Sequence, residues 1–347
     1  MKLGHGGDWA GFAEAYGREA LDFSANINPL GLPEGARRAA EEALLRADRY
    51  PDPLCRKLRA ALAAHHRVPA DYIVCGAGAA DLIYRLGTAL RPKTALLLAP
   101  AFSEYERALA PWGCEIRRYM LRKENDFRLD ESFLDAISPG LDLLVLCEPN
   151  NPTGVTTDPA LLRRILRRCR ERKVLLAADE CFLPFLSKPC SLIGELGEGG
   201  LLIFRAFTKF YAMAGLRLGY CLTDEPYLAA KLSRCGQPWA VTEAAAEAGI
   251  AALLDRAYAE ASRRLIGEQR EALAGGLRAL GLTVVPGEAN FLLFFSKDAE
   301  LGEKLARDGI LIRDCADYEG LSRGCFRIAV RTASENERLL EVLGRYV

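Results

Sequence analysis

The chain has 347 residues, half of them hydrophobic and 27% of them charged. This length exceeds one typical core and predicts a large and a small domain in a globular protein. Lys plus Arg equals Asp plus Glu, at 46 residues each. No overall field would therefore draw the protein to nucleic acid or to an anionic membrane, and we expect neither as a partner.

Eleven cysteines are spread along the chain, and no two of them lie closer than nine residues apart. This spacing predicts no metal site and no disulfide framework, and reduced thiols are typical of a cytoplasmic protein. The first residues carry charges and Gly-Gly in place of an apolar segment, and no apolar run reaches membrane-spanning length. We expect a cytoplasmic protein that binds no metal.

The first half of the chain predicts an α/β fold. Residues 1–30 are rich in Gly, Asn and Pro and predict an irregular arm that packs on the body or on a partner subunit. Short apolar runs then alternate with helical patterns. We expect strands at 72–75, 94–98, 141–147, 174–178 and 201–204, and helices at 33–46, 54–66, 79–90, 103–112 and 159–172. Such alternation predicts a mostly parallel sheet covered by helices on both faces.

The pattern changes after residue 240. The longest predicted helix spans 256–280, and the chain ends in a helix at 334–346 with Ser334 as N-cap and Glu337 as its capping-box partner. Strands at 282–286, 290–295 and 325–331 flank a helix at 299–308. We expect three parts: 1–45 as the arm with part of the small domain, 46–255 as the large domain, and 256–347 as the α+β small domain.

Four candidate site residues lie at or just beyond the ends of predicted strands: Gly76, Asn151, Asp179 and Lys209. In parallel sheets, ligands bind at the carboxyl ends of the strands. The turn Gly76-Ala77-Gly78 opens a helix, whose free N–H groups could hold a phosphate, although an ordinary strand-to-helix turn explains it equally well. The sequence predicts a binding site at this edge of the sheet.

Lys209 lies between an apolar run and the turn Gly215-Leu-Arg217-Leu-Gly219. Burial disfavours an ammonium group, and a neutral amine can form a Schiff base with an aldehyde. Arg217 is a permanent cation suited to a phosphate. The alternative is a surface lysine beside a loop.

Asn151 and Asp179 each allow two interpretations. Asn151 stands in a Pro- and Gly-rich turn, where it could also donate a hydrogen bond to a phenolate-like oxygen. Asp179 ends an apolar strand, and a buried carboxylate needs a cationic partner such as a protonated pyridine nitrogen. A helix N-cap is the alternative for Asp179.

The order Gly76-x-Gly78, Asn151-Pro-Thr-Gly, Asp179-Glu, Lys209 and Arg217 resembles the class I and II aminotransferase family of fold-type I pyridoxal-phosphate enzymes, over essentially the whole chain. The resemblance implies that Lys209 and Asp179 are catalytic and that 46–255 is the domain that binds pyridoxal 5′-phosphate. Its other implied contacts to the cofactor come from Gly78, Ala79, Ala80, Phe102, Asn151, Thr208 and Arg217, and from Tyr50 of a neighbouring subunit.

The contact from Tyr50 implies a homodimer with shared active sites.

Two positions depart from the family pattern. Phe182 replaces a tyrosine that bonds the 3′-oxygen of the cofactor in many relatives, and Ala206 replaces a hydroxyl residue. Each change removes a hydrogen bond of about 1 kcal/mol.

Two arginines, Arg327 and Arg331, alternate along a predicted strand and would share one face of it. They could bind two anions or be solvated. The resemblance implies that Arg327 holds the substrate α-carboxylate, and Arg331 is our candidate for a further anion, a phosphate. His5 and Asn28 of the arm are candidate substrate contacts.

The arm is similar to that of family members that decarboxylate a phosphorylated amino acid, and it lacks the Asn-Glu-Asn-Pro of histidinol-phosphate aminotransferases. We expect pyridoxal-phosphate-dependent decarboxylation of a small phosphorylated amino acid. A phosphate-recognising aminotransferase is the alternative. A non-catalytic ligand-binding relative is a third, which the presence of Lys209, Asp179 and Asn151 argues against.

Overall fold

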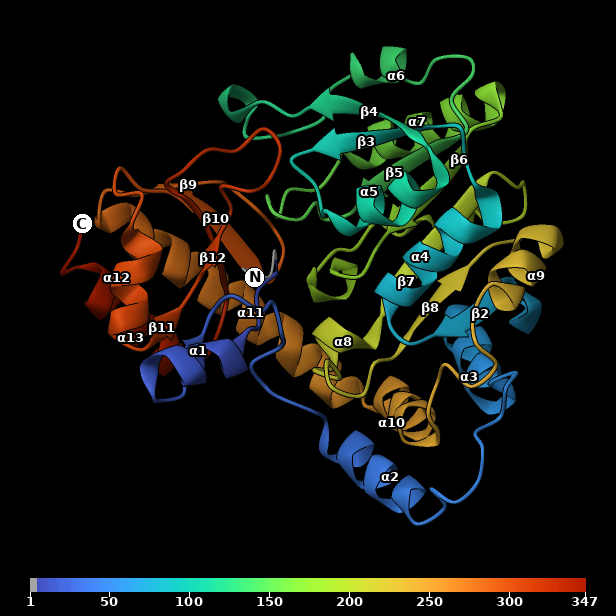
Figure 1. The fold of residues 1–347 in the computed structure, drawn as a ribbon, viewed down its shortest axis with the longest axis horizontal. Helices are drawn as coiled ribbons and strands as arrows, with labels where there is room; N and C mark the ends of the chain where they lie inside the picture. The colour runs from blue at the N-terminus through green and yellow to red at the C-terminus, as the bar shows by residue number, and fades with distance from the viewer. Residues whose placement is uncertain (1–4) are drawn as a thin grey trace.

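The computed structural model describes residues 5–347. Within these residues, seven strands form the central sheet in the order β2-β8-β7-β6-β5-β3-β4 (Figure 1). The strands are β2 (Ile73–Gly76), β3 (Thr94–Ala99), β4 (Glu115–Met120), β5 (Leu143–Cys147), β6 (Leu175–Asp179), β7 (Leu201–Ala206) and β8 (Gly219–Leu222). β8 runs antiparallel to both of its neighbours, and the other strands run parallel. The predicted α/β class with a mostly parallel sheet is confirmed.

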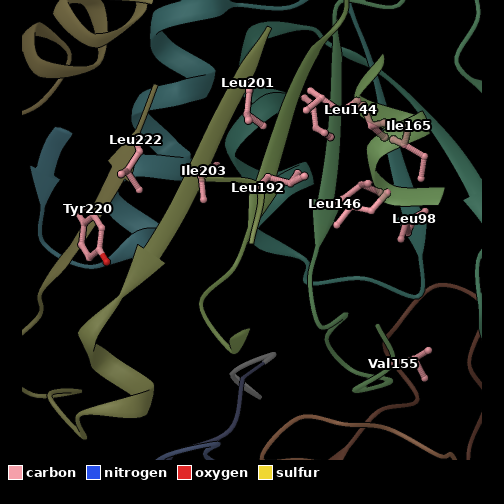
Figure 2. Close-up of a cluster of buried hydrophobic side chains, with 14 of the residues drawn as sticks. Leu98, Leu144, Leu146, Val155, Ile165, Leu192, Leu201, Ile203, Tyr220 and Leu222 are labelled. Atoms are coloured by element: carbon pink, nitrogen blue, oxygen red, sulfur yellow. The ribbon is translucent and has the colours of Figure 1, made fainter. Parts of the chain in front are cut away.

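Side chains of the sheet alternate between two buried layers. Leu144 and Leu146 of β5 and Ile203 of β7 point into the layer that Ile165 of α7 closes (Figure 2). Val145 points into the opposite layer, which α4, α5 and α9 cover. Because both faces are buried, the central strands consist of almost continuous apolar residues, which is why they were predictable.

Two strands of the sheet were not predicted. β4 lies at the edge of the sheet and has the sequence Glu-Ile-Arg-Arg-Tyr-Met, with its charged residues exposed. Such a strand lacks the apolar run by which buried strands are recognised. β8 is only four residues long and begins at Gly219, inside the motif that was interpreted as a turn.

Helices cover the two faces as the alternation predicts. α4 (Ala79–Leu90) and α7 (Pro159–Arg172) have the predicted ends. Asp158 caps α7 by accepting hydrogen bonds from the amides of Ala160 and Leu161. The other helices of this part are α2 (Glu34–Leu44), α3 (Arg56–His66), α5 (Glu104–Leu109), α6 (Phe133–Ala136), α8 (Phe207–Phe210), α9 (Pro226–Arg234) and α10 (Glu243–Leu254).

A second sheet, in the order β12-β13-β10-β9, is antiparallel throughout. It contains β9 (Thr283–Val284), β10 (Phe291–Phe295), β12 (Arg313–Asp314) and β13 (Cys325–Ala329). The helices beside it are α11 (Arg256–Ala279), α12 (Leu301–Arg307) and α13 (Ala333–Leu343). Among the described residues, no helix is both long and apolar enough to cross a membrane.

The N-terminal arm is more regular than expected. It contains α1 (Trp9–Tyr16), which Asp8 caps by accepting a hydrogen bond from the amide of Gly11. Its strand β1 (Leu21–Asp22) pairs in parallel with β11 (Ile310–Leu311). The arm is thereby joined to the C-terminal part of the chain, and it lies beside α11 and α13 in Figure 1.

The predicted capping box of the last helix was wrong by two residues. Thr332, not Ser334, is the N-cap of α13, and its partner is Glu335. The amide of Thr332 donates to the Glu335 carboxylate, and the Thr332 hydroxyl accepts from the amide of Glu335, so the two bonds of the box run in opposite directions.

Candidate active site

A cavity of about 210 Å³ lies at the carboxyl ends of β5, β6 and β7. Of the residues predicted for the site, the cavity lining includes His5, Ala79, Ala80, Phe102, Asn151, Asp179, Thr208, Lys209, Arg217 and Arg327. These residues come from the arm, from loops of the central sheet and from β13. Gly78, Tyr50, Asn28 and Arg331 are not part of the lining.

Lys209 lies on α8, three residues after the end of β7. Burial, and next the positive charge of Arg327, lower the pKa of its ammonium from 10.5 to about 8. Among the described residues, none forms a hydrogen bond or an ion pair with the amine. A fraction of the amine is therefore neutral and nucleophilic near neutral pH.

Asp179 is the last residue of β6 and is 5% exposed. Its Oδ2 accepts a hydrogen bond of 2.7 Å from the Tyr105 hydroxyl, and its Oδ1 accepts one of 3.0 Å from the amide of Cys181. Burial raises the pKa of Tyr105 well above 10, so the phenol stays a donor. These two hydrogen bonds fix the carboxylate at the cavity wall. Tyr105 was not predicted, because it lies in α5 and only the tertiary structure brings it to Asp179.

The N-terminus of α4 forms a cup beside Arg217. Gly78 has φ +94°, and a Cβ on it would lie 2.8 Å from Nη2 of Arg217. A Cβ on Gly219 would lie 2.5 Å from the amide nitrogen of Ala79. Glycine is required at position 78 because of the positive φ and at position 219 because the two backbones approach so closely. The amides of Ala79 and Ala80 open the helix and remain available to an anion.

Asn151 and Arg327 contact each other across the cavity. Nη1 of Arg327 donates to Oδ1 of Asn151, and Nη2 donates to the carbonyl of Ser24 at 2.9 Å. The amide oxygen of Asn151 is therefore engaged, and its NH₂ group remains as a donor. Arg327 is 6% exposed, and its Nε has no partner among the described residues. A buried guanidinium of this kind is suited to a carboxylate ligand.

A third arginine, Arg313, lines the cavity with Arg217 and Arg327, and the sequence did not predict it. It is the cross-strand partner of Arg327 in the β12–β13 ladder, so the two side chains share a face. Its Nη2 donates to both carboxylate oxygens of Asp317, at 2.8 and 2.7 Å. Strands of two residues, such as β12, leave no periodic pattern by which this position could have been recognised.

Arg331, the predicted second arginine, lies elsewhere. β13 ends at Ala329, so the alternation does not continue to Arg331. The guanidinium donates to the carbonyl of Asp22 at 3.0 Å and to Glu335 at 2.5 Å. The structure therefore gives this side chain a role in holding the arm and the start of α13 together, and it does not bring it to the cavity.

The side chain of Asn28 does not line the cavity, because its hydrogen bonds go to other parts of the chain. Its Nδ2 donates to the carbonyl of Phe210 at 2.8 Å and to Ser262 Oγ at 2.7 Å, and its backbone amide donates to the carbonyl of Lys209 at 3.1 Å. Asn28 holds the segment that carries Lys209.

Tyr50, the predicted contact to a neighbouring subunit, lies at the surface. It is 80% exposed and stacks on Trp239 with ring centroids 4.5 Å apart.

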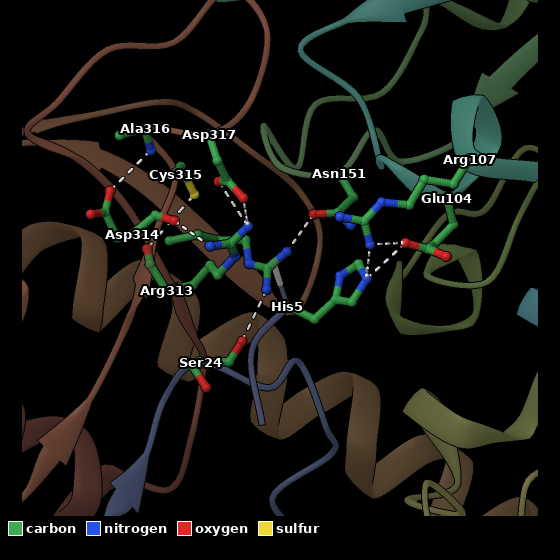
Figure 3. A network of polar contacts seen from close by, with 11 residues as sticks. His5, Ser24, Glu104, Arg107, Asn151, Arg313, Asp314, Cys315, Ala316 and Asp317 are labelled. Atoms are coloured by element: carbon green, nitrogen blue, oxygen red, sulfur yellow. Dashed lines mark hydrogen bonds and ion pairs between the residues drawn. The ribbon is translucent and has the colours of Figure 1, made fainter. Parts of the chain in front are cut away.

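His5 reaches the cavity from the arm. Its Nε2 lies 2.8 Å from Oε1 of Glu104 (Figure 3). Its ring lies 5.7 Å from that of Phe102, measured between ring centroids. Phe182 and Ala206, the two departures from the family pattern, also line the cavity. Phe182 packs edge-on against Phe291, at 5.0 Å between centroids.

A lysine at the end of one strand, a carboxylate at the end of the next and an anion cup at a helix N-terminus are the arrangement of a fold-type I pyridoxal-phosphate enzyme. Residues 18–343 match the model of the aminotransferase class I and II family, and the chain belongs to this family. The family resemblance of the sequence is thereby confirmed.

Among curated relatives, the chain is 41% identical to the threonine-phosphate decarboxylase of Salmonella typhimurium over 346 residues, which cover 98% of this chain and 95% of the relative. It is 34% identical to the histidinol-phosphate aminotransferase of Methanothermobacter thermautotrophicus, with coverage of 96% and 92%. Among solved structures, the histidinol-phosphate aminotransferase of Clostridium acetobutylicum superposes with a TM-score of 0.88 at 28% identity, covering 94% of this chain and 99% of that one.

Proposed function

We propose that the protein is a pyridoxal-phosphate-dependent decarboxylase. The substrate is L-threonine O-3-phosphate, the product is (R)-1-amino-2-propanol O-2-phosphate, and the pathway is cobalamin biosynthesis; L-serine O-phosphate is a further candidate substrate. The observation that carries this proposal is the pair of arginines, Arg313 and Arg327, side by side at one cavity with a nucleophilic lysine. Two cations suit a substrate with two anionic groups, a carboxylate and a phosphate.

The residues of the cavity fit pyridoxal 5′-phosphate. The amides of Ala79 and Ala80, with Thr208 and Arg217, would hold its phosphate, and the absence of a Cβ at Gly78 leaves space beside Arg217 and Thr208. Lys209 would hold the aldehyde carbon covalently. When bound, the cofactor supplies an electron sink for the electron pair that the departing carboxyl group leaves on Cα.

The side chains around the ring tune and position it. Asp179, kept in place by Tyr105, is an anion at the strand end that would pair with the protonated pyridine nitrogen. The NH₂ group of Asn151 would donate to the 3′-oxygen, because Arg327 already occupies its amide oxygen. Phe102 lines the same cavity and would stack on the ring.

Arg327 and Lys209 would determine which bond is broken and what replaces it. Arg327 would hold the α-carboxylate by a bidentate contact, in the orientation that lets the C–C bond to the carboxyl group break. Arg313 and His5 would hold the phosphate at the arm side of the cavity. Lys209, with its pKa near 8, can then give the proton that takes the place of carbon dioxide at Cα.

The enzyme would act as a cytoplasmic homodimer with shared sites. Tyr50 lies outside the cavity of its own chain and is 80% exposed, as a residue that reaches the cofactor phosphate of a neighbouring subunit must be. Its partner in the stack, Trp239, is 43% exposed. The division of the chain into an arm, a large domain at 46–255 and a small domain at 256–347 is part of this proposal.

Histidinol-phosphate aminotransferase is the second candidate, because relatives of that name are 34% identical over nearly the whole chain. Such an aminotransferase would use the same residues to bind the cofactor and would also take a substrate that carries a phosphate. A keto acid distinguishes the two: an aminotransferase given histidinol phosphate and 2-oxoglutarate produces glutamate continuously, and a decarboxylase does not.

The experiment that tests the proposal is release of carbon dioxide from L-threonine O-3-phosphate by the purified holoenzyme. The Lys209→Ala variant is the control and should release none above background. Borohydride reduction followed by peptide mapping should place the cofactor mass on Lys209. Continuous glutamate formation without carbon dioxide release would instead assign the protein to the aminotransferases.

A further inference from the structure

Glu104 on α5 is a buried carboxylate at the centre of a half-exposed polar cluster that includes His5 of the N-terminal arm. The residue is 9% exposed, and one carboxylate oxygen, Oε1, lies 2.8 Å from His5 Nε2 and 2.9 Å from Arg107 Nη1. The other oxygen, Oε2, accepts a hydrogen bond of 2.6 Å from the Tyr84 hydroxyl. The cluster joins the arm to α4 and α5, and Figure 3 shows the His5 ring turned with Nε2 towards Glu104.

The contacts of the carboxylate decide which nitrogen of His5 can meet a ligand. Nε2 of His5 lies 2.8 Å from Glu104 Oε1 and 3.3 Å from Arg107 Nη1, so this nitrogen is engaged by the cluster and is not available to a ligand in the cavity. The ring itself lines the cavity and packs against Phe102. The remaining nitrogen, Nδ1, is then the only polar atom of the ring that can contact a bound molecule.

Glu104 is itself held in place from two sides. Tyr84 and Arg107 donate to its two oxygens, so the carboxylate has a defined orientation before any ligand binds. The hydrogen bonds to Tyr84 and His5 also lower the pKa of Glu104 against the opposing effect of burial, and the group stays an anion at neutral pH. The carboxylate of Glu104 therefore fixes the orientation of the His5 ring through its contact with Nε2.

We propose that Glu104 is a positioning residue that holds His5 against the cavity with Nδ1 directed to the phosphate of the substrate. The proposal rests on the proposed function in one respect, that the bound substrate carries a phosphate at the arm side. Glu104 does not line the cavity and acts through His5. It therefore contributes to selection of phosphorylated over unphosphorylated amino acids.

The first test is steady-state decarboxylation of L-threonine O-3-phosphate by the holoenzyme. E104Q should raise KM roughly 10-fold, the cost of one hydrogen bond to a charged group, with kcat within about 2-fold. Y84F, which removes one of the hydrogen bonds to Glu104 and leaves its charge, should raise KM by a smaller factor of about 2 to 3. E106Q is the matched control on the same helix, because Glu106 pairs with Arg118 and should leave KM unchanged.

A double-mutant cycle separates positioning from a merely structural role. If Glu104 acts through His5, the variant that combines H5A with E104Q has the KM of H5A alone. Multiplication of the two effects, or an unchanged KM in E104Q, would overturn the proposal.

A spectroscopic signature tests the same contact without relying on turnover. The chain has three histidines, so ¹⁵N-histidine labelling gives few signals, and H5A assigns that of His5. E104Q should move both ring nitrogen resonances of His5 and leave those of His65 and His66 in place, whereas E106Q should move none. An unmoved His5 signal would overturn the proposal even if carbon dioxide release is confirmed. A moved signal with no carbon dioxide release would support the contact and reject only the proposed function.

Discussion

The cofactor end of the cavity comes from residues directly after neighbouring parallel strands, whereas the substrate end comes from the arm and from the second sheet. Asp179 closes β6 and Lys209 follows β7 by three residues, so the pairing of these two neighbouring strands brings both residues to one edge of the sheet. His5, Arg313 and Arg327 meet only because β1 pairs with β11 and β12 pairs with β13. The first end is built on a rigid scaffold, and the second depends on how distant segments dock.

Substitutions at the cofactor end of the cavity should cause the largest loss of activity. Asp179→Asn removes a buried negative charge while keeping the hydrogen-bonding shape. We expect kcat/KM for L-threonine O-3-phosphate to fall by roughly 10²- to 10⁴-fold, because the loss of one partner of a buried charge pair costs about 3–5 kcal/mol. Steady-state carbon dioxide release measures it. Tyr105→Phe, which removes one neutral hydrogen bond to the same carboxylate, should cost only about 5-fold. Equal effects of the two variants would contradict an electrostatic role for Asp179.

The buried amine should also cost stability in the cofactor-free protein. The folded-state pKa of Lys209 is about 8 against 10.5 for an ordinary lysine, so below pH 8 both states are protonated and the folded state bears the full penalty. Lys209→Met should therefore raise the free energy of unfolding at pH 7 by up to roughly 3 kcal/mol.

The gain should shrink as the pH rises from about 8 towards 10.5, because the folded state then loses its proton before the unfolded state does. Urea denaturation at pH 7 and pH 9 measures the difference. Lys93→Met, at an exposed lysine, is the control and should show no such dependence. A gain that is constant over this range would contradict the lowered pKa.

Substitutions of Arg313 and Arg331 test the substrate end of the cavity. Arg313→Leu should raise KM for threonine phosphate by roughly 10- to 100-fold, the loss of a charged hydrogen-bond pair, with a smaller effect on kcat. Arg331→Leu should leave KM within about 2-fold and lower the melting temperature, because its partners are Asp22 and Glu335. A large rise in KM for Arg331→Leu with an unchanged KM for Arg313→Leu would indicate that Arg331 binds the substrate phosphate, as the sequence pattern predicted.

The smallest effect is expected at Phe182. Phe182→Tyr places a hydroxyl at the cavity wall, where many relatives have one next to the 3′-oxygen. We expect the cofactor absorbance band to shift and kcat/KM to change by no more than about 5-fold, since one hydrogen bond contributes about 1 kcal/mol. The absorbance spectrum of the holoenzyme measures it. A loss as large as that of Asp179→Asn would show that the edge-on contact with Phe291 matters more than the hydroxyl.

Prediction from sequence succeeded where a structural element needs a long apolar run or a marked cap. The buried strands β5 and β7 and the helices α4 and α7 were predicted nearly to the residue. It failed for α1 in the arm, for the exposed edge strand β4 and for the two-residue strand β12. These segments owe their conformation to contacts with distant parts of the chain, which leave little local pattern.

The sequence by itself determined the family, the fold and the position of the cofactor end, because each of those residues follows a strand whose hydrophobic pattern is local. Only the tertiary structure decided the substrate end. Pairing of β12 with β13 brings Arg313 beside Arg327, and docking of the arm brings His5 to Glu104. Such contacts join residues about 100 positions apart in the chain or in separate strands, and their energies depend on the whole fold.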